Sequence, residues 1–402
     1  MNKSLIKNFR EIHFKRLDKN FFIHNLKQDF HLIAIPYKKQ NFIIEELYKW
    51  KVIKLFSLNY KKLEYSKIVF GKIFYEKILI YLVIDPAPKY RSLNNYYSKK
   101  YINIKSREIK DKIEKNLIDY FVTRNPKEFL EKFSLIFGIG ALKYLENNND
   151  KLNKLKPLSK PLGYLGWKNF NEFISFANIS CDWIVLRNFE FLPYKFSEND
   201  KDIDILCRDK KLFIRKLNLK KRSWGISSYQ VNIGNKKIPV DLRFIGDGYF
   251  DKLWEENILR NKIFQNNLVP RPSNLDYFYS LIYHSKLQKN KVKQIYSERL
   301  DYLKLTLEMH NLKKSFIYND LITSKILSDF MNFNKYNISE PIDKSVEVNY
   351  YFLKQLKNNI DIINNNEIPL LVKFVLRIPL PLRNFIFKLK KYLILNKKNL
   401  LK

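Results

Sequence analysis

Three aspartates in two short apolar stretches have the residue types and the spacing that metal-assisted chemistry requires. Asp202 and Asp204 flank one isoleucine in KDIDIL, and Asp241 lies in PVDLRF. Because alternate residues of a β-strand point to the same face, the first two carboxylates are expected to project together, away from a core that holds Ile203 and Ile205. Three carboxylates on two neighbouring strands can hold two divalent cations about 3.5–4 Å apart, the arrangement used for in-line displacement at phosphorus. The spacing therefore predicts transfer of a nucleotide or a related phosphoryl group, with Mg²⁺ or Mn²⁺ as the cofactor.

The elements expected to position these acids are two strands, a helix and a β-hairpin. In chain order they are predicted in DWIVLRN, DIDILC, DKKLFIRKLNL and YQVNIGNKKIPVDLRFIG. Asp209 is expected to cap the helix, and the hairpin is expected to turn at Gly234-Asn235. Its second strand carries Asp241, 37 residues after Asp204 (241 − 204). Since buried carboxylates are costly without a cation or a partner, their place inside apolar strands favours a functional site over a chance D-x-D.

This order of strands and acids resembles the nucleotidyltransferase superfamily that includes DNA polymerase β and the tRNA CCA-adding enzymes. The resemblance implies that the acids of the first strand bind both metals. The third acid, here Asp241, would bind the catalytic metal and help to activate the attacking hydroxyl. The resemblance covers about Trp167 to Lys289. Within it, the pattern LRNFEFLP, DIDIL, IPVDLRFIGDGYFDKLW and LVPRPSNLDYFYSLIYHSKLQK is similar to an uncharacterised branch associated with bacterial surface-polysaccharide genes.

The superfamily holds the triphosphate with a Gly-Ser pair ahead of the acids, and this chain departs from the pattern there. Arg187 and Asn188 stand in the matching place, in VLRN. Arg187 is expected either to bind phosphate as a bidentate ligand or to pair with an aspartate. Arg243 shares a strand face with Asp241, so it is expected either to neutralise phosphate or to form a solvent-side salt bridge.

His284 and Lys286, in SLIYHSKLQK, are further candidates for binding the substrate or its phosphate. His284 would orient a phosphate or a base at the mouth of the site, and its structural alternative is a satisfied core histidine. Asp247 and Gly248 are expected to form a turn.

The composition limits the classes of protein to which the chain can belong. With 402 residues, 46% of them hydrophobic and 15% aromatic, the chain is not a disordered one. Nine glycines are few, and neither a Walker loop nor G-x-G-x-x-G occurs. The net charge of +35 favours an anionic partner such as nucleic acid, anionic lipid or a phosphorylated substrate. An AT-rich genome, however, produces the same abundance of Lys, Asn, Ile, Phe and Tyr without any selection for binding.

The fold class is expected to be α/β (α+β), in several parts. These are an N-terminal α/β module over 1–146, a linker over 147–166, a nucleotidyltransferase-like core with a mixed sheet and flanking helices over 167–262, a helical region over 263–364, and a basic amphipathic tail over 365–402. In the N-terminal module, IVFGKIF and ILIYLVID are predicted as strands. Pro126 and Gly138 mark the start and end of a predicted helix.

The expected localisation is cytoplasmic, with the tail as a peripheral contact on the inner face of the cell membrane. Cys181 and Cys207 are isolated, which suits a reducing compartment. No apolar run is long enough for a signal peptide or a transmembrane helix. Bulky apolar residues interleaved with Lys and Arg in the tail favour an anionic membrane surface as partner. The alternative is a terminal helix whose basic face lies in water.

Three functions are weighed from these observations. The first is a metal-dependent nucleotidyltransferase-like transferase in surface-polysaccharide biosynthesis, with a nucleotide donor and a sugar or lipid-linked glycan acceptor. The second is an RNA-modifying nucleotidyltransferase of the tRNA or toxin type, for which RNA is the partner. The third is a non-catalytic nucleotide- or glycan-binding module on the same fold.

Overall fold

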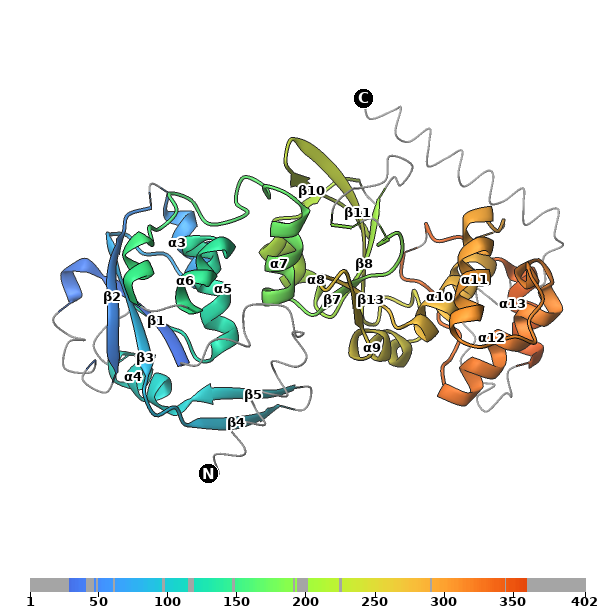
Figure 1. The fold of residues 1–402 in the computed structure, drawn as a ribbon, viewed down its shortest axis with the longest axis horizontal. Helices are drawn as coiled ribbons and strands as arrows, with labels where there is room; N and C mark the ends of the chain where they lie inside the picture. The colour runs from blue at the N-terminus through green and yellow to red at the C-terminus, as the bar shows by residue number, and fades with distance from the viewer. Residues whose placement is uncertain are drawn as a thin grey trace. The chain divides into compact units, whose positions relative to one another are not determined.

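A computed structural model of the chain describes most of it. The described residues are 29–40, 47, 50–60, 62–95, 98–114, 119–146, 149–190, 192–193, 202–223, 226–289, 291–343 and 345–359. The predicted basic tail over 365–402 lies outside these residues. The fold is mixed α/β, as predicted (Figure 1). The chain divides into two compact units. The first unit is Met1–Ser273 with Ser339–Asp343, and the second is Asn274–Ile338 with Lys344–Lys402.

The first unit contains an antiparallel sheet in the strand order β2-β3-β1-β6 (Figure 1). Its strands are β1 (Asp29–Pro36), β2 (Lys51–Leu58), β3 (Ile78–Asp85) and β6 (Phe121–Val122). Every residue of β1 and β3 is buried, which explains why both strands are nearly continuous apolar runs. The strand predicted in ILIYLVID is therefore confirmed as β3.

Helices and a hairpin accompany this sheet. They are η2 (Tyr37–Lys39), α3 (Leu63–Phe70), β4 (Tyr90–Asn95), β5 (Ser98–Asn103), α4 (Ile104–Glu114), α5 (Pro126–Phe137), η4 (Ile139–Leu142), α6 (Lys143–Glu146) and η5 (Asn149–Lys154). Helix α5 follows the sequence prediction: Asn125 caps it by accepting a hydrogen bond from the backbone of Glu128, and it ends at Gly138. The strand predicted in IVFGKIF is wrong. Its first three residues are the end of α3, whose buried residues repeat with helical spacing; the helix stops at left-handed Gly71, and the rest of the stretch is neither helix nor strand.

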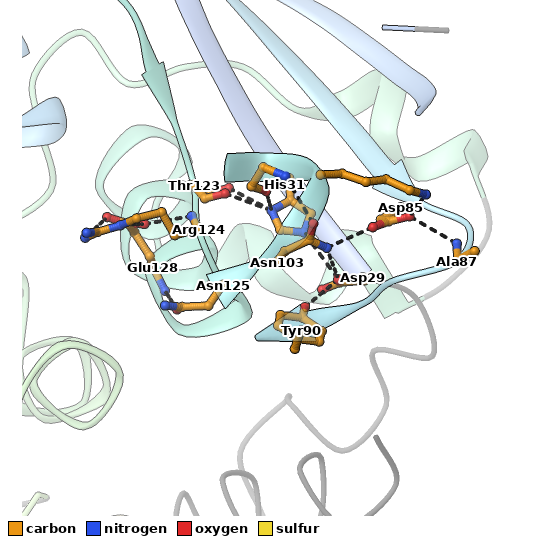
Figure 2. Close-up of polar contacts among 12 residues, drawn as sticks. Asp29, His31, Asp85, Ala87, Tyr90, Asn103, Thr123, Arg124, Asn125 and Glu128 are labelled. Carbon is orange, nitrogen blue, oxygen red and sulfur yellow. Dashed lines mark hydrogen bonds and ion pairs between the residues drawn. The ribbon is translucent and has the colours of Figure 1, made fainter. Parts of the chain in front are cut away.

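One end of this sheet holds a buried polar cluster that the sequence did not indicate. Asp29 and Asp85 face each other as partners on β1 and β3. His31 lies between the Asp29 carboxylate, 3.2 Å from Nε2, and the Thr123 carbonyl, 3.0 Å from Nδ1. The amide of Asn103 donates to both carboxylates, at 2.8 Å to Asp85 and 3.3 Å to Asp29 (Figure 2).

The cluster fastens the β4–β5 hairpin and helix α4 to the sheet. Tyr90, at the start of β4, donates to Asp29 at 2.5 Å, and Lys105, in the first turn of α4, pairs with Asp85 at 2.5 Å. Burial raises the pKa of Tyr90, and the Asp29 charge raises it further, so the phenol stays protonated. Because these buried groups satisfy one another, we assign the cluster a structural role.

The second sheet of this unit carries the predicted acids, in the strand order β7-β8-β11-β10-β9. Its strands are β7 (Trp183–Val185), β8 (Ile203–Cys207), β9 (Lys220–Lys221), β10 (Ser228–Ile233) and β11 (Lys236–Phe244). Strands β8 and β11 are parallel, and the other neighbours are antiparallel. The predicted hairpin and the predicted pairing of the two acidic strands are both confirmed.

Further elements complete the first unit. They are α7 (Phe170–Ser180), α8 (Lys210–Leu217), α9 (Lys252–Arg260), β12 (Ile263–Gln265) and β13 (Val269–Arg271). Asp209 caps α8 by accepting from the backbone of Leu212, as predicted. The described part of the predicted linker is hydrogen-bonded within the unit: Leu158 donates to the carbonyl of Ile136 at 2.7 Å.

The second unit is helical in the residues that the structure describes. Its helices are α10 (Asn274–Lys286), α11 (Gln294–Thr306), η6 (Phe316–Tyr318), α12 (Asp320–Asn334) and α13 (Tyr350–Asn359). Helix α12 packs on α10 and α13. Among the described helices of both units, none is both long enough and apolar enough to cross a membrane.

Candidate active site

Two of the predicted acids lie side by side on the second sheet. Asp204 in β8 and Asp241 in β11 are Cα partners of the parallel pair. Neighbouring strands lie about 4.8 Å apart, and paired residues point to the same face of the sheet. Ile203 and Ile205 are buried, as predicted. Asp202 lies one residue before β8, so the three carboxylates belong to one small region of the sheet.

Each of the paired acids is held by an arginine. Nη2 of Arg187 lies 2.5 Å from one Asp204 oxygen and Nε lies 3.2 Å from the other. Nη2 of Arg243 lies 2.8 Å from one Asp241 oxygen. Both arginines are 5% exposed. Of the two expectations for Arg187, the structure contains the ion pair with an aspartate, and the ion pair of Arg243 is buried rather than on the solvent side.

Tyr249, which the sequence did not single out, joins the two ion pairs. Its hydroxyl is 3.1 Å from Nη1 of Arg187, and its ring centre is 4.3 Å from the guanidinium carbon of Arg243. A cation over an aromatic face is attracted by the ring electrons. Burial raises the pKa of Tyr249 to about 12, so the side chain is a neutral phenol at physiological pH.

The turn that carries Tyr249 is held by two buried carboxyl groups. Glu255, from α9, accepts hydrogen bonds from the backbone of Gly246 at 2.6 Å and of Phe250 at 3.2 Å. Asp247 accepts from the backbone of Tyr249 at 2.9 Å. Burial, and after it the charge of Asp247, raise the pKa of Glu255 to about 9. The pair therefore shares a proton at neutral pH and links α9 to the two arginines through the turn.

The charges of neighbouring aspartates raise the pKa of Asp202 and of Asp204. Burial is the largest cause for Asp202, and together with the charges of Asp204 and Asp241 it raises the pKa of Asp202 to about 6. Burial also raises the pKa of Asp204, although Arg187 opposes this. Oδ1 of Asp241 is buried and accepts no hydrogen bond from any described residue. A region with crowded carboxylates and an unpartnered buried oxygen favours an added cation.

Carboxylate oxygens are the ligands that Mg²⁺ prefers. As the side chains lie, the described residues include no group of three or more His, Cys, Asp and Glu that could hold a metal ion. Arg187 donates to both oxygens of Asp204, so Asp204 could take part in holding a cation only if Arg187 turned away. The observation that favours a cation here is the buried Oδ1 of Asp241, which has no hydrogen-bond partner among the described residues.

Asn188 has a left-handed backbone, with φ of 61°. It stands where the superfamily pattern has Gly-Ser, and asparagine is among the few residues besides glycine that adopt this conformation readily. The chain therefore makes a left-handed turn at this position without a glycine.

The Asn188 turn gives a first prediction. Asn188→Ala is expected to have a free energy of unfolding about 1 kcal/mol lower than Asn188→Gly, because a Cβ without a polar side chain disfavours the left-handed region. Urea unfolding of the two variants measures the difference. Equal stabilities would show that the backbone conformation at this position is not strained.

His284 and Lys286 lie on α10, which belongs to the second unit, whereas the three acids belong to the first unit. Nδ1 of His284 is 3.3 Å from the Gln288 side-chain oxygen, and its ring packs edge-on against Tyr296. Lys286 forms an ion pair with Asp320. Both side chains thus have partners within their own unit, which is the structural alternative for His284. Their binding of substrate stays a prediction.

Comparisons of the chain with protein-family models, with curated proteins and with solved structures find no match. The resemblance to the nucleotidyltransferase superfamily therefore depends on the acids themselves and on the order of the strands that carry them.

Proposed function

We propose that the chain is a metal-dependent nucleotidyltransferase-like enzyme. It would transfer a nucleotidyl or related phosphoryl group to a hydroxyl or phosphate acceptor. The acceptor class that we propose is a sugar or lipid-linked glycan of surface-polysaccharide biosynthesis. The observation that carries the proposal is the register of Asp204 and Asp241 on adjacent parallel strands, with Asp202 at the start of the first.

The side chains of the site would divide the work as follows. Mg²⁺ or Mn²⁺, when bound, supplies charge neutralisation on the phosphates and acidifies the attacking hydroxyl. Asp202 must first lose its proton, because its pKa is raised to about 6. Asp241 would orient the acceptor hydroxyl through Oδ1. Arg187 would exchange Asp204 for a phosphate, since its guanidinium fork fits either anion, and would thereby take over the role of the missing Gly-Ser.

A non-catalytic binding module is the second candidate, and one observation favours it. Arg187 already neutralises Asp204 with two hydrogen bonds, so this acid has its counter-charge without a metal. If the pair never opened, the sheet would keep the acids as structural partners of the arginines. Any ligand would then bind without a divalent cation.

Calorimetric titration of Mn²⁺ and each nucleoside triphosphate into the full chain separates the two candidates. The wild type is expected to bind one nucleotide only when Mn²⁺ is present, and the double variant Asp202→Asn/Asp204→Asn is expected to lose this binding. Asp209→Asn is the matched control, because it removes one negative charge at a helix cap where asparagine is equally good. Mn²⁺ affinity should rise from pH 5 to pH 7, as Asp202 loses its proton.

Two results would contradict the enzyme proposal. One is a folded wild type that binds no nucleotide with or without Mn²⁺. The other is nucleotide binding that is independent of Mn²⁺ and survives in the double variant, which is the behaviour expected of the binding module.

A further inference from the structure

Arg243 and Ser227 together hold one carboxylate oxygen that comes from a distant part of the chain. Nη1 of Arg243 lies 3.3 Å from Oδ2 of Asp343, 100 residues later. The hydroxyl of Ser227 donates to the same oxygen at 2.6 Å. Arg243 and Asp343 are each 5% exposed, and Ser227 is 7% exposed. A guanidinium and a hydroxyl that converge on one oxygen are also the donors with which proteins bind a phosphate oxygen.

Two lysines add positive charge beside these donors. The ammonium groups of Lys210 and Lys221 both donate to the carbonyl of Ile226, at 2.9 and 3.3 Å. Partial burial lowers the pKa of both lysines, and for Lys210 the charge of Lys221 lowers it further. The charge of Asp343 opposes this lowering in both. Asp343 is therefore close enough to serve as a counter-charge for the lysines as well as for Arg243.

These groups lie at the carboxyl end of the parallel strand pair. Arg243 is the last residue but one of β11, and Lys210 follows the end of β8 by three residues. In open α/β sheets, ligands bind outside the carboxyl ends of the strands. The positive charges and the Ser227 hydroxyl thus gather where such a sheet offers a ligand site.

Asp343 reaches this place on a five-residue segment, Ser339–Asp343, which belongs to the first unit although the residues on both sides of it belong to the second. We call this segment the strap. The backbone of Ile342 donates to the carbonyl of Asp247 at 2.8 Å. The strap is part of neither a helix nor a strand, so it can leave the sheet without breaking a secondary-structure element.

We propose that Arg243, Ser227 and the two lysines form a binding site for a phosphate or diphosphate group, and that Asp343 closes this site as an internal stand-in for the group. A diphosphate brings more negative charge and more acceptor oxygens to these cations than one carboxylate does. The exchange uses Nη1 of Arg243 and leaves Nη2 on Asp241. Because the donors are buried, the site fits the phosphate end of a small molecule rather than a nucleic-acid strand.

The identification of that small molecule with a substrate of the transfer rests on the proposed function. The existence of the anion site does not, and it is tested without a divalent cation.

Calorimetric titration of pyrophosphate into the full chain, in the absence of divalent cations, is the first test. Asp343→Asn keeps the size of the side chain and an oxygen for Ser227, but it loses the charge that competes with the ligand. We expect this variant to bind pyrophosphate about tenfold more tightly than the wild type, because the ligand no longer has to displace a charged hydrogen bond from Arg243. Glu340→Gln, which removes the same charge from the strap but leaves Asp343 on Arg243, is the control and should change the affinity less than about twofold.

The wild type gives a second readout that needs no variant. If pyrophosphate takes the place of Asp343, the strap must leave, and the backbone N–H of Ile342 loses the Asp247 carbonyl as its acceptor. Hydrogen exchange of the Ile342 amide should therefore become faster when pyrophosphate saturates the wild type, although a bound ligand ordinarily stabilises the native state and slows exchange. A purely structural ion pair predicts no acceleration.

Three results would overturn the proposal. They are an affinity for pyrophosphate that does not rise in Asp343→Asn, an Ile342 amide that exchanges no faster in the saturated wild type, and no pyrophosphate binding by either folded protein. If Asp343→Asn does not fold, the exchange measurement on the wild type decides. Each of these results leaves the metal-dependent transfer to its own titration, so failure of the anion site and failure of the proposed function are told apart.

Discussion

Arg187→Met is expected to lower the free energy of unfolding by about 3–5 kcal/mol at pH 7. The change removes the arginine that pairs with Asp204 and leaves the Asp204 carboxylate buried beside the charge of Asp241. A buried charge without its partner must either stay ionised at a high cost or take up a proton. The loss should therefore be smaller at pH 5 than at pH 7. Urea unfolding at the two pH values measures both effects.

Two further variants test whether the loss of stability comes from the unpaired charge of Asp204. Arg208→Met breaks an ion pair with Asp182 at 2.8 Å, but that arginine side chain is 49% exposed, so the expected cost is under about 1 kcal/mol. The double variant Arg187→Met/Asp204→Asn should recover most of the stability, because no charge is then left unpaired. A double variant as unstable as the single one would show that Arg187 acts through packing rather than through its charge.

Arg187→Met also separates the two candidate functions. If the acids bind a divalent cation, Mn²⁺ can supply the charge that Arg187→Met removed, and the variant should be stabilised by Mn²⁺ more than the wild type is. If the site is a binding module closed by arginines, Mn²⁺ should leave the unfolding midpoints of both proteins unchanged. This comparison needs neither a substrate nor an assay of activity.

The parts of the site that sequence could predict are those set by local rules. The D-x-D strand, the hairpin and the Asp209 cap each depend on the alternation of apolar residues or on a side chain within a few positions. The wrong prediction of a strand in IVFGKIF also came from a local rule, the preference of its residues for β-structure. Its β-branched and aromatic residues favour a strand, but the residues before Gly71 bury a helical face that packs on α5, and Gly71 ends the helix.

The parts that sequence could not predict depend on tertiary contacts. Arg187 was expected either at a phosphate or at an aspartate, and only the packing of β7 beside β8 brings it to Asp204. Asp343 is separated from Arg243 by 100 residues and by most of the second unit, so no spacing rule connects them. The cluster around His31 likewise draws its members from separate strands and a helix.

Glu255→Ala is expected to lower the free energy of unfolding by about 3–5 kcal/mol, because two backbone N–H groups and the shared proton lose their partner in a buried place. The groups are those of Gly246 and Phe250, which end the turn that carries Tyr249. Glu256→Ala, one position later on α9 and less buried, is the control, with an expected change within about 0.5 kcal/mol. Urea unfolding at pH 7 measures both variants. A loss below 1 kcal/mol for Glu255→Ala would show that the turn holds without this carboxyl group.

The pH dependence follows from the raised pKa of Glu255. In the folded protein this group keeps its proton up to about pH 9, whereas its ordinary pKa is 4.5. Between these pH values the folded state binds more protons than the unfolded state, so the contribution of Glu255 to the free energy of unfolding falls as pH rises. Glu255→Gln does not titrate. It lacks one acceptor for the backbone, so it should be about 1–2 kcal/mol less stable than the wild type at pH 6.

The two stability curves should therefore approach each other as pH rises from about 4.5 to about 9, because over this range the unfolded state has lost the Glu255 proton that the folded state still binds. A constant difference over this range would mean that Glu255 is already ionised at neutral pH and that the pair holds no shared proton. The turn also holds Tyr249 against Arg187 and Arg243. Ionisation of Glu255 should therefore affect these two arginines as well as the turn. Loss of the proton should loosen the hold on Arg187 and Arg243 before the protein unfolds. Native-state hydrogen exchange of the turn amides, at pH 7 and pH 9, distinguishes this local opening from global unfolding.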